Sequence, residues 1–107
     1  MGKRRVYSEE EIAKTLVLPG EGQLFGKVIG LYGFGWFSVM CSDGKVRNCR
    51  VRGKLRRRIW VKMGDIVLVE PWPFEERKGE ILFRYTIGQV EYLIDNKYIE
   101  KSLVEDP

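Results

Sequence analysis

The residues best able to do chemistry in this sequence are cations gathered in one stretch. Nine Lys and Arg and no Asp or Glu lie between Asp43 and Asp65, and Trp60 stands among them. The chain has 19 basic and 15 acidic residues, so without these nine it would have 10 basic against 15 acidic. Phosphates take up such charge by releasing their counterions, and a base can stack on an aromatic ring. The stretch therefore suits a polyanion, and a nucleic acid above all.

Charge runs are more often solvated surface segments or disordered tails than binding sites, and that plainer interpretation applies here too. This stretch, however, lies between two apolar, strand-like segments. Apolar residues also interrupt it, at Val51, Leu55, Ile59 and Val61. Such interleaving indicates folded structure, because a segment that stays disordered has few apolar residues to bury. We therefore expect a folded domain to display the cations.

Other chemistry has weak support in the sequence. There is no histidine, and the two cysteines, Cys41 and Cys49, cannot complete a four-ligand zinc site within one chain. Both lie in apolar strand patterns, so we expect buried free thiols and neither a disulfide nor a bound metal. General acid–base catalysis would fall to carboxylates, and the glutamates at 9–11 and 75–76 have the pattern of solvated loop charges. We predict no enzyme activity and no cofactor.

The length and the N-terminus set the organisation of the chain. Its 107 residues suit one domain, and no apolar run approaches about twenty residues. The charged N-terminus has no apolar signal segment after it, so a cytoplasmic protein that avoids membranes is expected. Residues 1–19 are predicted to form a flexible basic arm, in which Ser8 and Glu11 match a capping box that could begin a short helix.

Five strands are predicted between residues 20 and 86. Apolar runs of strand length, some alternating with polar residues, are broken by glycine, proline or Ser-Asp-Gly. The prolines at 71 and 73 cannot donate to a strand ladder, so they predict a loop over 71–79. The predicted strands are Leu24–Tyr32, Trp36–Cys41, Val46–Val51, Asp65–Glu70 and Glu80–Thr86.

The segment after Val51 is too short and too charged for a long helix but fits a single helical turn that buries Leu55. Five strands with a short helical crossover between the third and the fourth are the layout of an OB-fold. This small Greek-key barrel binds oligonucleotides or oligosaccharides on its second and third strands. We therefore predict an all-β, five-stranded OB-fold barrel over residues 20–86, with its binding strands leading into the basic stretch.

A C-terminal helix is predicted to pack on the barrel. Thr86 and Gln89 match a capping box, and the apolar residues that follow are spaced for one helical face. The helix is expected over residues 87–97. Residues 98–107 are polar and acidic, and we expect this short tail to fray.

The turn between the second and third strands decides which side chains share a face. A two-residue Asp-Gly loop would pair Phe37 with Arg50, which places charge opposite an apolar face. A three-residue Ser-Asp-Gly loop, with Gly44 left-handed, pairs Phe37 with Cys49, and we favour it. Arg47 then falls opposite an inner residue, so it must reach out at the barrel rim or a second bulge must intervene. The outer face holds Trp36, Ser38, Asn48 and Arg50, and the inner face Phe37, Val39, Cys49 and Val51.

Three strings in the sequence resemble a known family. They are Cys41–Gly44 (Cys-Ser-Asp-Gly), Arg52–Val61 (Arg-Gly-Lys-Leu-Arg-Arg-Arg-Ile-Trp-Val) and Asp65–Val69 (Asp-Ile-Val-Leu-Val). Together they resemble translation initiation factor 1A of archaea and eukaryotes, over about residues 19–94. The short acidic tail and the modest N-terminal arm look more like an archaeal member than a eukaryotic one.

The resemblance implies an OB-fold that binds the small ribosomal subunit at the decoding (A) site, where it contacts rRNA. It also implies help in placing initiator tRNA and mRNA, other initiation factors as partners, and a monomer when free. Trp36 stands where eukaryotic members tend to carry a basic residue, so stacking replaces an ionic contact in our prediction. The predicted RNA-binding residues are Arg47, Arg50, Arg52, Lys54, Arg56, Arg57, Arg58, Trp60 and Trp36.

Three alternatives stay open at this point. A generic cold-shock or S1-like protein that binds single-stranded RNA would share the barrel. A small nucleic-acid enzyme would need paired buried carboxylates or a metal, and a protein-interaction module would use Trp72 and Phe74. Two roles are also open: Trp36 could stack on RNA or pack in the barrel, and Trp60 could stack or close the barrel, although we favour its exposure.

Overall fold

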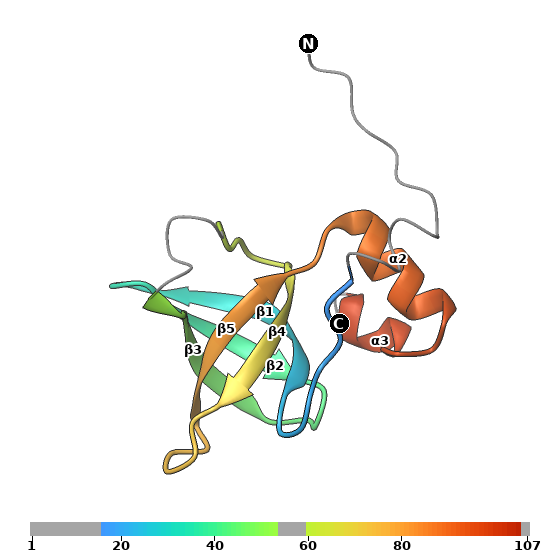
Figure 1. The fold of residues 1–107 in the computed structure, drawn as a ribbon. Coiled ribbons are helices and arrows are strands. Elements are labelled where there is room, and N and C mark those ends of the chain that lie inside the picture. The colour runs from blue at the N-terminus through green and yellow to red at the C-terminus, as the bar shows by residue number, and fades with distance from the viewer. Residues whose placement is uncertain (1–15, 54–59, 106–107) are drawn as a thin grey trace.

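The structure, a computed structural model, describes residues 16–53 and 60–105 (Figure 1). Its centre is a closed barrel of five strands in the order β1-β2-β3-β5-β4, in which only β3 and β5 pair in parallel. The predicted five-stranded OB-fold barrel is confirmed. The crossover turn and the burial of Leu55 lie outside the described residues. The elements are β1 (Leu24–Tyr32), β2 (Trp36–Cys41), β3 (Val46–Val51), β4 (Ile66–Pro71), β5 (Lys78–Arg84), α2 (Ile87–Asp95) and α3 (Lys101–Val104).

β1 closes the barrel because it is long enough to pair with two strands. Residues 24–27 pair with β4, and residues from 26 onward pair with β2, as far as Tyr32 opposite Trp36. Gly26 lies at a crowded point of the sheet, and a Cβ atom there would meet Cγ1 of Val39 at 2.5 Å. No side chain larger than hydrogen fits without moving a core residue.

The hairpin of β2 and β3 has the three-residue loop that the sequence predicted. Phe37 lies opposite Cys49, as the favoured register requires, and Gly44 has a φ of +86°. This left-handed conformation suits glycine because it has no Cβ to clash with the following carbonyl. Arg47 lies opposite the core residue Val39. The pairing therefore places this cation opposite an inner residue, as the favoured register predicts.

The inner side chains of all five strands form the barrel core. Cys41 and Cys49 are buried there as free thiols, which confirms that prediction for both. Burial raises the pKa of Cys41, and it raises that of Cys49 to about 12, so neither forms much thiolate at neutral pH. The core residues are Val28, Val39, Cys41, Cys49, Val51, Val67, Val69 and Ile81.

The connection between β4 and β5 is shorter than predicted. β4 runs through Pro71, which lies opposite Gly79 at the end of the strand, where the missing N–H costs little. β5 begins at Lys78 rather than Glu80. The backbone N–H of Trp72 donates to the carbonyl of Lys78 over 3.0 Å, so these two residues are held beside each other.

A second apolar cluster joins the barrel to the C-terminal helices. α2 begins with the predicted capping box, in which Thr86 and Gln89 each bond the other's backbone N–H. Its buried Leu93 packs with residues of β1 and β4, as Figure 1 shows for the helices beside one end of the barrel. Within the described residues, no helix is long and apolar enough to cross a membrane.

The predicted boundaries at both ends of the chain need correction. α2 ends at Asp95, and the segment beyond it packs instead of fraying: Ile99 is buried in the second cluster and α3 follows. The ammonium of Lys27 donates to the carbonyl of Val104 over 2.8 Å. The apolar residues at 99, 103 and 104 explain the difference, because they give the tail a face to bury.

Residues 16 and 17, which the prediction placed in the N-terminal arm, contact the folded domain. Leu16 packs against the second cluster, and the hydroxyl of Tyr85 donates to the carbonyl of Val17, so the segment around 16–18 belongs to the fold. Burial raises the pKa of Tyr85, which keeps this hydroxyl a donor. The rest of the predicted arm, with the possible helix start at Ser8, lies outside the described residues.

Candidate nucleic-acid interface

Two tryptophans and two cations meet on the outer face of β2, β3 and β5. Trp36 in β2 lies directly opposite Arg50 in β3. The rings of Trp36 and Trp72 meet edge to face, with centres 6.0 Å apart and planes at 65°. The guanidinium carbon of Arg50 lies 5.5 Å from the ring centre of Trp36 and 5.4 Å from that of Trp72, and Lys78 Nζ lies 5.5 Å from both. We call these four residues the tryptophan–cation cluster.

Contacts within the cluster favour this arrangement of its four side chains. Each cation within about 6 Å of an indole face is attracted by roughly 0.5–1 kcal/mol at an exposed site. Both tryptophans are half-buried, so each ring keeps some surface that solvent can reach. The arrangement therefore offers positive charge and aromatic surface together, which is the combination that single-stranded nucleic acids bind.

Sequence patterns predicted half of this cluster. Trp36 and Arg50 followed from the β2–β3 register, but Trp72 was absent from the predicted RNA-binding set and Lys78 lies outside the basic stretch. The missing information is the parallel pairing of β3 with β5, in which Asn48 lies opposite Lys78. Alternation within one strand does not predict which distant strand pairs with it.

Arg52 is held by carboxylates of two other strands. Its Nε donates to Oε1 of Glu80 over 2.7 Å, and its Nη2 donates to Oε2 of Glu70 over 2.5 Å. Gln23 also donates to Glu70, and the hydrogen bonds from Gln23 and Arg52 lower the pKa of that carboxyl. The Arg52 side chain is 40% exposed. It can therefore reach RNA, but a phosphate would have to compete with these carboxylates.

Arg47 is used inside the protein. Its side chain is 5% exposed, and its two Nη atoms donate to the carboxylate of Asp43 over 3.1 and 2.9 Å. Its Nε donates to the carbonyl of Glu76 over 2.8 Å. The guanidinium thus ties the β2–β3 loop to the β4–β5 loop at the barrel rim, without the second bulge. The prediction that Arg47 contacts RNA directly is at odds with this geometry.

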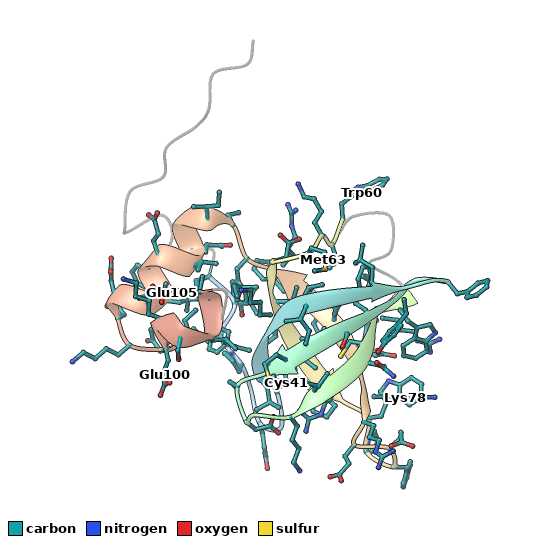
Figure 2. All side chains as sticks on the ribbon, turned by 180° about the vertical axis from the view of Figure 1, so that it is seen from behind. Cys41, Trp60, Met63, Lys78, Glu100 and Glu105 are labelled. Atoms are coloured by element: carbon teal, nitrogen blue, oxygen red, sulfur yellow. The ribbon has the colours of Figure 1, made fainter. Side chains whose placement is uncertain are left out.

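Trp60 is 76% exposed, which confirms the predicted exposure, and Figure 2 shows it pointing away from the barrel. The backbone is anchored there, because Nη1 of Arg84 donates to the Trp60 carbonyl over 3.1 Å. Figure 2 also shows Lys78 at a separate place on the molecule, so Trp60 does not belong to the tryptophan–cation cluster. The predicted RNA-binding residues Lys54, Arg56, Arg57 and Arg58 lie outside the described residues.

Comparison with known proteins decides the family. Residues 13–107 match the family described as Translation initiation factor 1A / IF-1. The chain belongs to this family. Translation initiation factor 1A of Pyrococcus abyssi is 47% identical over 93 residues, which are 86% of this chain and 80% of the relative. That of Pyrobaculum aerophilum is 50% identical over 76 residues, covering 71% and 67%. The resemblance to this family, predicted from three short strings, is confirmed, and so is the likeness to archaeal members.

Solved structures support the same fold for this initiation factor. A translation initiation factor from the Wolbachia endosymbiont strain TRS of Brugia malayi superposes with a TM-score of 0.51 at 32% identity, over 67% of this chain and 85% of that one. YloQ, a circularly permuted GTPase, superposes with a TM-score of 0.50 at 24% identity. This chain covers only 23% of YloQ, and that likeness shows the fold alone.

Proposed function

We propose that this initiation factor binds the small ribosomal subunit at the decoding (A) site through rRNA. In that position it helps to place initiator tRNA and mRNA at the start site, alongside other initiation factors. Family membership supports the process, and the outer face of β2 and β3 supports the mode of binding. OB-fold barrels bind oligonucleotides on these two strands. Here the strands present Arg50 against Trp36, and the basic stretch continues from the end of β3.

Phosphate contacts carry most of the affinity in this mechanism. Each phosphate neutralised on single-strand-like RNA contributes about 0.7 to the fall of log K with log salt concentration. With about six cations in contact, the slope is near −4. Specificity then comes from the shape of the folded rRNA site, because phosphate contacts position a protein without reading sequence.

Co-sedimentation with small and large ribosomal subunits over a salt series tests the proposal. We expect pelleting with the small subunit only, and a salt slope near −4. The double variant Arg57→Glu, Arg58→Glu should lose the binding and keep its melting temperature. Binding that does not change with salt, or equal pelleting with both subunits, would overturn the mechanism.

A competition assay separates the alternative function. A generic binder of single-stranded RNA would be displaced from the small subunit by unstructured oligonucleotide at a nucleotide concentration comparable to that of the rRNA site. A factor that fits a folded site would resist this competitor. The exposed aromatic surface of Trp36 and Trp72 also suits a generic binder of single-stranded RNA, because any base can stack on an aromatic ring.

A further inference from the structure

A hollow lies between α3 and the barrel. Its volume is about 770 Å³, more than any one side chain can fill. Ile29 and Met63, which line it, are 41% and 56% exposed. Figure 2 shows Met63 beside the barrel and Glu105 on the helical part of the molecule. We call this hollow the α3 groove, and its lining includes Lys27, Ile29, Met40, Met63, Leu103 and Glu105.

The groove continues a face of the sheet that the protein's own helices cover elsewhere. Lys27 lies opposite Ile66 of β4 on one side and opposite Met40 of β2 on the other. Met40 in turn lies opposite Val46 of β3, and residues directly opposite in a ladder point to the same face. Ile66 is buried in the second apolar cluster with the helices, whereas Val46 is 45% exposed. The helices therefore leave the β2–β3 part of this face uncovered.

The strands at the floor of the groove favour a helix as its occupant. Lys27 is paired on both sides, by β2 and β4, and Met40 by β1 and β3. The backbone N–H of Val28 donates to the carbonyl of Asp65 over 2.9 Å, and its carbonyl accepts from Gly64 over 2.8 Å. A partner strand would thus find no free edge at these positions, whereas a helix satisfies its own backbone. Methionine side chains also adapt to apolar surfaces of different shape.

The charges at the groove favour a protein over RNA. Lys27 is 7% exposed and its ammonium donates to the carbonyl of Val104 over 2.8 Å, so a ligand has little access to it. The Glu105 side chain is 59% exposed, and its pair with Lys101 over 3.4 Å is a surface pair that contributes little. In the part of the lining that the structure describes, a phosphate would meet the Glu105 carboxylate and no accessible cation. A lysine or arginine of a partner would instead pair with that carboxylate.

We propose that the α3 groove binds an amphipathic helix of a protein partner, with apolar side chains in the groove and a lysine or arginine beside Glu105. The inference goes beyond the proposed function, because this helix and rRNA bind different parts of the molecule. Recognition of a helix in a groove uses apolar side chains at positions i, i+3, i+4 and i+7. The exposed surfaces of Ile29 and Met63 are then removed from water, which drives the association.

Three synthetic helical peptides test the proposal on the full chain. The first has leucines on one face and lysines along its flank, the second has the same composition with the leucines spread around the helix, and the third has glutamates in place of the lysines. The ¹³C methyl signals of Met40 and Met63 report on the groove. We expect saturable shifts of both signals with the first peptide at concentrations up to about 1 mM, none with the second, and an affinity about two- to fivefold lower for the third. The indole signals of Trp36 and Trp72, which do not line the groove, should not shift.

Ile29→Asn and Leu31→Asn are matched variants. Both side chains are exposed on β1, but only Ile29 lines the groove. We expect the first peptide to bind Ile29→Asn about five- to tenfold more weakly, because apolar burial is lost, and Leu31→Asn with unchanged affinity. Glu105→Lys should reverse the preference between the lysine and glutamate peptides. Ile29→Asn should keep the salt slope of small-subunit binding, and a lower slope would mean that the groove binds RNA.

Other results would also overturn the proposal. The absence of any methionine shift at about 1 mM of the first peptide would exclude the helix site. Equal shifts with the second peptide would mean unspecific apolar contact. Methionine signals that move in the full-length variant Ile12→Glu, measured without peptide, would mean that the chain's own N-terminal segment fills the groove. Signals that change when the chain alone is diluted would mean that a second copy fills it.

Discussion

Replacing Arg47 with methionine should lower the stability of the barrel and leave its contact with RNA intact. Methionine keeps much of the side-chain length and removes the guanidinium. The variant loses two hydrogen bonds to the Asp43 carboxylate and one to the Glu76 carbonyl. The variant therefore distinguishes two roles of Arg47: stabilising the rim of the barrel, or contacting a phosphate.

The size of the effect follows from the exposure of the partners. Removing one member of a buried ion pair costs about 3–5 kcal/mol, mostly because the other charge stays buried. The Asp43 side chain is 31% exposed, so water can reach its carboxylate once Arg47 is gone. We therefore expect the free energy of unfolding to fall by about 2–3 kcal/mol, at or below the lower end of that range. For a domain of this length, this corresponds to a fall of roughly 10 °C or more in melting temperature.

The same pair predicts a pH dependence. The hydrogen bonds from Arg47 are the main reason that the pKa of Asp43 lies below its usual value. A carboxyl with a depressed pKa in the folded state adds stability above its unfolded pKa, and this stability is lost as pH falls through the folded pKa. The difference in melting temperature between wild type and Arg47→Met should therefore be largest at neutral pH and should decrease below about pH 4.

Asp43→Asn is the matched variant for this experiment. It breaks the same pair but keeps the cation, so thermal melts followed by circular dichroism should show a comparable loss of stability. Small-subunit binding, measured well below the melting temperatures, should keep the same salt slope in both variants. A slope that falls by about 0.7 in Arg47→Met alone would mean that Arg47 contacts a phosphate. A melting temperature within about 1 °C of wild type would refute the stabilising role of the pair.

Three further predictions concern other parts of the barrel. Gly44→Ala should cost about 1 kcal/mol, or about 4–8 °C in melting temperature, because alanine is strained at a φ of +86°; an unchanged melting curve would contradict the left-handed turn. Cys41 and Cys49 should react with a thiol reagent slowly in the native protein and fast in denaturant, since burial raises the pKa of each thiol; rapid native labelling followed by mass spectrometry would contradict this. Glu80→Gln should tighten small-subunit binding about two- to fivefold at low salt, because it removes an anion that Arg52 now contacts; weaker binding would mean that this carboxylate positions Arg52 for RNA.

Local patterns predicted the barrel and its β2–β3 face because those features depend on neighbouring residues. The length of the Ser-Asp-Gly loop fixes the register, and the register places Trp36 opposite Arg50. The same patterns did not show that Arg47 is held within the protein, since a charge count takes every cation in a basic stretch as available. The carboxylate that holds Arg47 lies only four residues before it, and a check across the hairpin could have found it.

Long-range pairing accounts for the rest of the site. Trp72 and Lys78 reach Trp36 only because β5 pairs with β3, and this pairing joins segments separated by the whole β4 connection. The docking of the tail was missed for a related reason. Ile99 and α3 have too few residues for a helical period, so the burial of Ile99 and the partial burial of Leu103 and Val104 depend on the surface that α2 and β1 offer them.

The pairing of cations within the protein gives an independent estimate of the salt dependence. Of the nine cations in the basic stretch, Lys45, Arg47 and Arg52 have carboxylate partners within the described residues. If these three keep their partners on the ribosome, six remain for phosphate, and the slope is about −4. Lys45 pairs with Glu76 over 3.5 Å, so Lys45→Met should leave this slope unchanged.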